Sequence, residues 1–262
     1  MNAKNWIIEF WHFRELLVAL TLREIKIRYK QTLLGAAWAV LQPAALAVIF
    51  SIIFGHFLQI ESPQTPYIVF YYSALVPWTF FSNSVTFGSL SVVNNSSLVT
   101  KVYFPREILP FASIGAAFFD FITSSLIFLM LMIFYKVNPS INVLYLFLII
   151  PSIFIFAAGI SLILSTINVM YRDIKFVVPL VLQVWLFATP IIYTIDRIPD
   201  SIRKFYVFNP LAPLINSFRQ VTVLDKNPSI FELQLAILIS IMTFLFGILF
   251  FKYKERVFAD II

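Results

Sequence analysis

Long intervals without a single charged residue constrain the fold of this chain more than any other feature. Five such intervals are bounded by Lys30 and Glu61, Glu61 and Lys101, Lys136 and Arg172, Lys175 and Asp196, and Glu232 and Lys252. Each contains an apolar run close to the roughly 20 residues that a helix needs to cross a bilayer. Only 12% of the 262 residues are charged, whereas a soluble domain usually has about a quarter. The pattern therefore predicts an integral membrane protein.

An all-α membrane protein with six transmembrane helices fits this pattern. A sixth apolar run, residues 109–135, is interrupted only by Asp120. Because lipid offers no hydrogen-bond partners, backbone groups in each run must pair within the segment, which a helix achieves. We place the spans at about 33–56, 67–90, 109–135, 143–168, 176–195 and 233–251, within a single domain of residues 1–262.

Two segments outside the spans also have a predicted structure. Residues 5–20 place polar side chains three or four positions apart among aromatic and aliphatic ones, which indicates an N-terminal amphipathic helix in the membrane interface. That helix is either a plain anchor or a frame for a docking surface. Segment 196–229 is too long for a turn and too apolar for a free loop, so we expect short re-entrant helices at the outer face between the last two spans.

The distribution of Lys and Arg predicts an orientation. With six spans both termini lie on one side, and 13 of the 19 cations fall on that side. Short cytoplasmic segments carry such an excess, so a multi-pass protein of the cytoplasmic (inner) membrane with both termini in the cytoplasm is predicted. This topology and anionic lipid explain the net charge of +6, and no nucleic-acid partner is expected. The chain has no Cys, and we predict no metal site.

A basic arm precedes the first span. Its four cations are Arg23, Lys26, Arg28 and Lys30. The alternation of apolar and basic residues would suit a strand, but a lone strand has no partner for its backbone groups, which favours a helix. In a helix Glu24 and Arg28 are four positions apart, in the order that favours an ion pair.

Three cytoplasmic segments together carry a family resemblance. They are the basic arm, the sequence Lys-Val-Tyr-Phe-Pro-Arg-Glu at 101–107, and Tyr-Arg-Asp-Ile at 171–174. With these motifs the chain resembles, over nearly its whole length, the membrane permease of type 2 ABC exporters that move polysaccharides: the O-antigen, capsule and teichoic acid export permeases, with O-antigen export permeases closest.

The resemblance implies a transport subunit, not an enzyme. ATP and Mg would be bound by a partner ABC ATPase present in two copies, with no cofactor on this chain; none of the six Gly forms a phosphate-binding loop. A short loop helix near 94–105 and the amphipathic helix would contact the ATPase, and Tyr103-Phe104-Pro105 would form a protruding knob. The implied coupling residues are Glu9, Arg14, Asn95, Leu98, Lys101, Tyr103, Phe104, Pro105, Arg106, Glu107, Arg172 and Asp173. Taken one by one, the cations among them are equally explained as ordinary topology signals.

The resemblance further implies a homodimer that passes a lipid-linked polysaccharide between its two copies. Arg23, Lys26, Arg28 and Lys30 lie where a lipid diphosphate headgroup would enter, although anchoring to membrane lipids explains them equally well. Asp120 is the one acid deep in a span, and it is a proton relay, a structural hydrogen-bonding group or the polar wall of a water-filled path. Candidate path residues are Asp120 and five aromatic residues, Trp38, Trp78, Trp185, Phe187 and Tyr193. Flat aromatic rings attract sugar rings without fixed hydrogen bonds and so let them slide.

Other functions remain open on the sequence. A type 2 ABC exporter of drugs or small lipids has the same fold. A membrane-embedded transferase acting on a polyprenyl lipid would need clustered acids or His, which the chain with its two His does not offer. A secondary transporter would need ionisable partners within the membrane.

Overall fold

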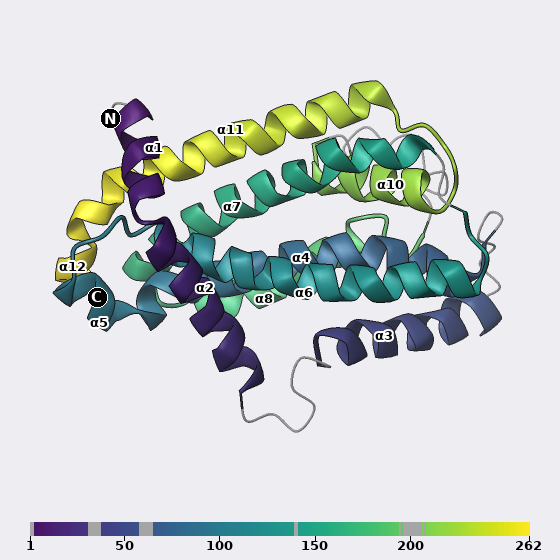
Figure 1. The fold of residues 1–262 in the computed structure, drawn as a ribbon, viewed down its shortest axis with the longest axis horizontal. Coiled ribbons are helices and arrows are strands. Elements are labelled where there is room, and N and C mark those ends of the chain that lie inside the picture. The colour runs from purple at the N-terminus through teal and green to yellow at the C-terminus, as the bar shows by residue number, and fades with distance from the viewer. Residues whose placement is uncertain are drawn as a thin grey trace.

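The computed structural model describes residues 3–30, 38–57, 65–138, 141–193, 195, 206 and 208–262, and these residues contain helices but no strand. Figure 1 shows the longest helices running side by side. The elements are α1 (Ala3–His12), α2 (Arg14–Tyr29), α3 (Trp38–Phe50), the π-helical η2 (Ser51–Phe57), α4 (Tyr67–Asn94), α5 (Ser96–Lys101), α6 (Ile108–Phe134), the 3₁₀ turn η3 (Ile141–Tyr145), α7 (Leu146–Met170), α8 (Ile174–Phe187), α10 (Leu211–Thr222), α11 (Ile230–Lys254), the 3₁₀ turn η5 (Glu255–Val257) and α12 (Phe258–Ile261).

Three segments of the described chain are long and apolar enough to cross a membrane: Ile108–Phe134, Ile141–Met170 and Ile230–Val257. They coincide with the predicted third, fourth and sixth spans. Shorter apolar helices, Pro43–Phe57 and Ile174–Phe187, fall in the first and fifth. The 14 residues of α8 extend about 21 Å, less than the ~30 Å hydrocarbon core, so the six-span count stays a prediction.

Helix α4 coincides with the predicted second span and lies at the centre of the bundle. It packs against α3, α6, α7, α8 and α10, and most of its side chains are buried. Four of its serines, Ser73, Ser84, Ser89 and Ser91, are therefore buried against protein. Ser161 donates to the Ser84 carbonyl at 3.0 Å, and Asn168 donates to the Ser89 carbonyl at 3.1 Å. These bonds join α4 to α7 where lipid could not satisfy the same groups.

Two glycines set the close crossing of α7 and α11. A Cβ on Gly247 would lie 2.6 Å from the Gly159 carbonyl oxygen, and a Cβ on Gly159 would lie 2.7 Å from the Phe244 backbone nitrogen. Small residues at a helix crossing let the backbones approach and pack in a membrane, where no hydrophobic force drives helices together. The two glycines therefore hold the fourth and sixth predicted spans as one unit.

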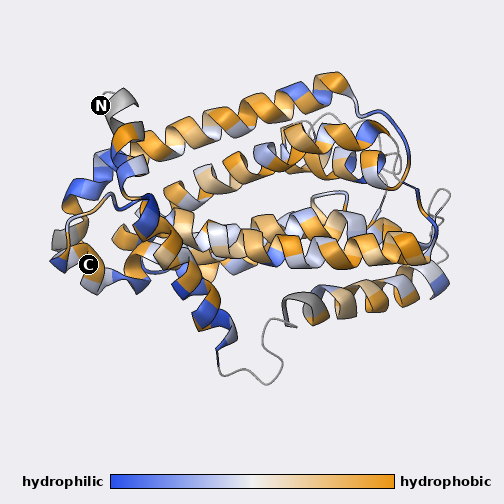
Figure 2. Ribbon diagram, in the orientation of Figure 1, coloured by the Kyte–Doolittle hydropathy of each residue, from blue (hydrophilic) through white to orange (hydrophobic). Residues whose placement is uncertain are grey.

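The cytoplasmic elements expected from the sequence lie together. Both ends of the chain, α1, α5 and α12 occupy one end of the bundle, and α10 lies at the other (Figure 1). Hydrophilic residues concentrate near the end with the termini, whereas α6, α7 and α11 are apolar along most of their length (Figure 2). The arm is helical, as predicted, being the second half of α2. The predicted helix at 5–20 is instead two helices that meet at Phe13.

The predicted loop helix near 94–105 is α5, six residues long. In the predicted re-entrant segment, α10 is an almost completely buried helix of 12 residues. Residues 196–205 and 207 lie outside the described residues, so the re-entrant arrangement of 196–229 stays a prediction.

Candidate functional site

The acid within the third predicted span is paired with an arginine of the basic arm. Helix α2 crosses α6, and Arg28 Nη1 lies 2.8 Å from Asp120 Oδ2. Tyr29 donates its hydroxyl to Asp120 Oδ1 at 2.5 Å. Each partner of the ion pair has a side chain only 11% exposed, and the Arg28 guanidinium lies 3.8 Å from the centre of the Phe87 ring. Arg28 therefore neutralises Asp120 at a desolvated position, where the attraction is stronger than in water.

Tyr29 contributes a neutral donor to this cluster. Burial and the hydrogen bond to Asp120 raise the pKa of the Tyr29 phenol well above its ordinary value. The hydroxyl therefore keeps its proton at neutral pH and can donate it to the carboxylate. Together Arg28 and Tyr29 give one donor to each oxygen of Asp120, which leaves further lone pairs of the carboxylate for other donors.

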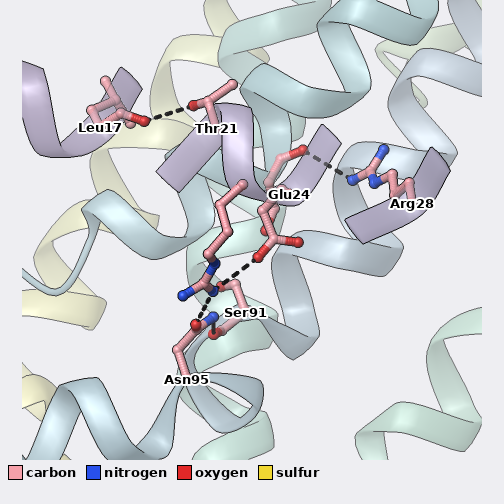
Figure 3. A network of polar contacts seen from close by, with 8 residues as sticks. Leu17, Thr21, Glu24, Arg28, Ser91 and Asn95 are labelled. Atoms are coloured by element: carbon pink, nitrogen blue, oxygen red, sulfur yellow. Dashed lines mark hydrogen bonds and ion pairs between the residues drawn. The ribbon is translucent and has the colours of Figure 1, made fainter. Parts of the chain in front are cut away.

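The predicted ion pair between Glu24 and Arg28 is wrong. Glu24 Oε1 instead lies 3.3 Å from Arg23 Nη2. Arg23 also donates to Asn95 Oδ1, and Asn95 donates to the Ser91 carbonyl at 2.8 Å, so this network joins α2 to the junction of α4 and α5 (Figure 3). Arg28 extends toward α6 instead, where its partner Asp120 is less exposed than Glu24 (11% against 21% of the side chain), and an ion pair attracts more strongly where it is less solvated.

The four cations of the arm thus divide into two pairs. Arg23 and Arg28 are held by contacts to α4 and α6. Lys26 and Lys30 are exposed and form no ion pair with any described residue.

A cavity of about 310 Å³ opens beside the Arg28–Asp120 pair. Helices α2, α3, α4 and α6 supply its walls, which include Trp38, Asn83 and Phe87. Trp38 is 50% exposed, and Asn83 is partly buried. The structure thereby brings together Trp38 and Asp120, two of the predicted path residues, with Arg28 from the predicted headgroup site. Asn83 has no charge and stands in no motif, so the sequence offered no signal for it.

The other predicted path residues lie elsewhere. Trp78 is buried in the core beside Phe81. Trp185 packs edge-on against Phe81 with ring centres 5.2 Å apart and donates its indole N–H to Asn209 Oδ1 at 3.0 Å. Phe187 is exposed on α8, and the Tyr193 hydroxyl donates to the Phe187 carbonyl at 2.9 Å.

A second polar cluster ties the loop after α5 to the end of α11. Glu107 is completely buried, and Lys252 Nζ lies 2.8 Å from its Oε2. Lys252 also lies 3.2 Å from Glu255 Oε1, and Arg106 donates to the Glu255 carbonyl. The predicted coupling residues Arg106 and Glu107 are thus anchored to a part of the chain about 150 residues away, a link that no local pattern predicts.

The protruding knob is narrower than predicted. Tyr103 is 85% exposed, but Phe104 is 6% exposed and packs in the core at this end of the bundle; Pro105 is buried as well. Phe104 and Pro105 support the loop, and Tyr103 alone projects. Glu9 of α1 lines the same cleft of about 260 Å³ as Tyr103, so the structure brings α1 and this loop together.

The remaining predicted coupling residues surround this end. Leu98 packs against the same core as Phe104, and Lys101 is exposed. Arg14 lies over the Trp11 ring at 5.5 Å. Arg172 and Asp173 are exposed between α7 and α8, where Arg172 lines a separate cavity of about 300 Å³ with Ile262.

Arg219 is a buried cation that the sequence did not mark as special. It is 1% exposed and donates to the carbonyls of Pro190 and Ile191 at 3.0 and 2.7 Å. Its guanidinium lies 3.9 Å from the centre of the Phe70 ring, and no carboxylate among the described residues pairs with it. Arg219 therefore fastens α10 to the turn after α8 and to α4.

A family model described as "ABC-2 type transporter" matches residues 15–223. This chain belongs to the ABC-2 type transporter family. The match runs from the start of α2 to just past α10 and so includes the Arg28–Asp120 cavity and the Tyr103 loop.

Curated relatives cover most of the ABC-2 chain. An "O-antigen export system permease protein RfbA" from Klebsiella pneumoniae is 32% identical over 79% of this chain and 80% of its own. A protein with the same description from Myxococcus xanthus is 28% identical over 96% of this chain and 97% of its own. A "Polysialic acid transport protein KpsM" from Escherichia coli is 24% identical over 91% and 93%.

Proposed function

We propose that this chain is the membrane subunit of an ATP-driven exporter that moves lipid-linked, O-antigen-like polysaccharide across the cytoplasmic membrane. Membership of the ABC-2 family carries the proposal, because it makes the chain a membrane transport subunit. Relatives described as O-antigen export and polysialic acid transport proteins favour polysaccharide over drugs or small lipids. Each of the three relatives covers most of this chain, so the comparison concerns the whole transport unit.

ATP hydrolysis is assigned to two copies of a partner ABC ATPase, which binds ATP and Mg. The sequence has no phosphate-binding loop of its own. The surface around Tyr103, α5 and Glu9 is the proposed docking site, because an exposed aromatic ring on a buried support is suited to a cleft on a partner. In this assignment both termini are cytoplasmic, since they lie at the same end of the bundle as α5, which Tyr103 closely follows in the chain.

A second copy of the chain is proposed to complete the path. Helices α3 and α8 are each packed on one side only and expose apolar side chains on the other, among them Trp38, Val48, Ile49, Phe176, Leu180, Val184 and Phe187. A path between two such faces would be apolar and partly aromatic, which suits a long glycan that must slide without strong fixed contacts.

Within this function Lys26 and Lys30 are proposed to attract the diphosphate headgroup of the lipid carrier. They are the two exposed cations of the arm, and charges near the membrane surface attract anionic headgroups. Arg23 and Arg28 act with them by holding α2 against α4 and α6.

Deletion of the chain from cells that make the polysaccharide tests the proposal. We expect loss of polysaccharide from the cell surface and accumulation of the lipid-linked chain inside, with both reversed when the gene is restored on a plasmid. Unchanged surface polysaccharide in the deletion strain would contradict the proposal.

A further inference from the structure

We propose that the cavity between α2, α3, α4 and α6 is a binding site for an uncharged saccharide unit, held by Asn83 and Asp120 and flanked by the Trp38 ring. The inference rests on the proposed function, and it names the part of the substrate that this site recognises: the sugar rather than the diphosphate.

The charge of the cavity selects a neutral ligand. Asp120 and Arg28 both line it, and they pair with each other at 2.8 Å, so their charges sum to zero. An anion would meet the Asp120 carboxylate, and a cation would meet the Arg28 guanidinium. Neither would recover the cost of leaving water at a partly buried site. A neutral molecule rich in hydroxyl groups loses less hydration free energy than an ion, and hydrogen bonds to both members of the pair can offset that loss.

Asn83 supplies the open hydrogen-bonding group. Its amide is partly buried in the cavity wall, and the polar contacts found among the described residues do not include it. An amide offers two donors and one acceptor oxygen, whereas Asp120 in its ionised form only accepts. Sugar hydroxyls donate and accept at once, so they complement the donors of Asn83 and the acceptors of both side chains.

The size and lining of the cavity agree with one sugar unit. The cavity volume of about 310 Å³ lies at the lower end of the ~300–1,000 Å³ found for small-molecule sites. Trp38 is half exposed and offers an apolar ring surface, while the polar groups lie on α2, α4 and α6. Apolar walls with a few placed polar groups are the usual composition of such sites.

Binding can be measured on the full chain reconstituted in lipid nanodiscs, without ATPase or transport. The probes are octyl glycosides of glucose, galactose, mannose and N-acetylglucosamine, with octyl sulfate and octyl phosphocholine as anionic and zwitterionic probes of the same chain length. Each is titrated below its micelle-forming concentration while tryptophan fluorescence is recorded, and Trp38→Phe identifies the part of the signal that comes from the cavity.

We expect at least one glycoside to give a saturable signal that disappears in Trp38→Phe, and neither octyl sulfate nor octyl phosphocholine to give one. Asn83→Leu should weaken the glycoside about tenfold, as the loss of one or two hydrogen bonds predicts, and the smaller polar Asn83→Ser should weaken it less. Asn94→Leu, on the same helix but outside this cavity, should leave binding unchanged.

Three results would overturn the inference: no saturable binding by any glycoside, binding of octyl sulfate or octyl phosphocholine as tight as that of the glycosides, or unchanged glycoside binding in both Asn83 variants. Each can occur while the deletion strain still loses surface polysaccharide. Failure of this inference is therefore distinguishable from failure of the proposed function.

Discussion

Removing Lys252 should destabilise the protein through the carboxylate that it leaves behind. Glu107 is completely buried, and Lys252 contacts it at 2.8 Å with a side chain that is 14% exposed. Breaking a buried pair from one side typically costs about 3 to 5 kcal/mol, because the remaining charge loses the opposite charge that compensated it. We expect Lys252→Met to cost about 3 kcal/mol, the lower end of that range, since some water reaches Lys252.

A double-mutant cycle separates the pair from the burial of each side chain. In Lys252→Met with Glu107→Gln the fully buried charge is gone and only the partly exposed Glu255 carboxylate has lost its partner, so the double variant should recover most of the loss. The measurement is the free energy of unfolding in mixed micelles, followed by far-UV circular dichroism as sodium dodecyl sulfate is added. Lys254→Met, two positions along the same helix, is the matched control and should change stability little.

The cycle can refute this reasoning in two ways. A loss below about 1 kcal/mol in Lys252→Met would place the pair in the class of solvated surface ion pairs. A double variant that is the sum of the two single variants would mean that Glu107 and Lys252 do not interact.

Three further predictions concern other parts of the chain. Gly159→Ala should lower the free energy of unfolding by about 1 to 3 kcal/mol, since its Cβ would lie 2.7 Å from backbone; Gly115→Ala, whose Cβ would have its nearest contacts with side-chain atoms of Thr21 at 3.0 Å, should cost less in the same titration. Tyr103→Ala should leave the melting temperature unchanged, since the ring is exposed, but reduce copurification of the ATPase; full copurification would contradict its docking role. Replacing Lys26 and Lys30 with Gln should weaken binding of a polyprenyl diphosphate in nanodiscs, with the difference from wild type shrinking at high salt; equal binding at low salt would remove them from headgroup recognition.

The helices were predictable because lipid tolerates so few charges. Long uncharged runs bounded by Lys, Arg, Asp or Glu indicate spans whatever the tertiary structure, and three segments long and apolar enough to cross a membrane coincide with predicted spans. Helix α8 shows the limit of this reasoning. Its uncharged interval continues to Asp196, but α8 ends at Phe187, shortly before Pro190. The hydropathy of a segment shows that it can lie in lipid, but it does not show where the helix ends.

The polar contacts of the candidate site were not predictable from spacing. Helical periodicity pairs Glu24 with Arg28, yet Arg28 contacts Asp120, 92 positions away, because α2 crosses α6. Lys252 and Glu107 are 145 positions apart. Such pairs depend on how helices cross, and crossings depend on close contacts such as that of Gly159 with Gly247, which no local pattern specifies.

Transport by the reconstituted complex tests the central claim most directly. The chain and its ATPase would be placed in proteoliposomes that contain lipid-linked polysaccharide, and a glycosidase added to the compartment on the export side would report the glycan that has crossed. We predict that glycan becomes accessible only when ATP is supplied to the side that carries Tyr103. A complex that hydrolyses ATP while no glycan becomes accessible would contradict the claim that this chain exports polysaccharide.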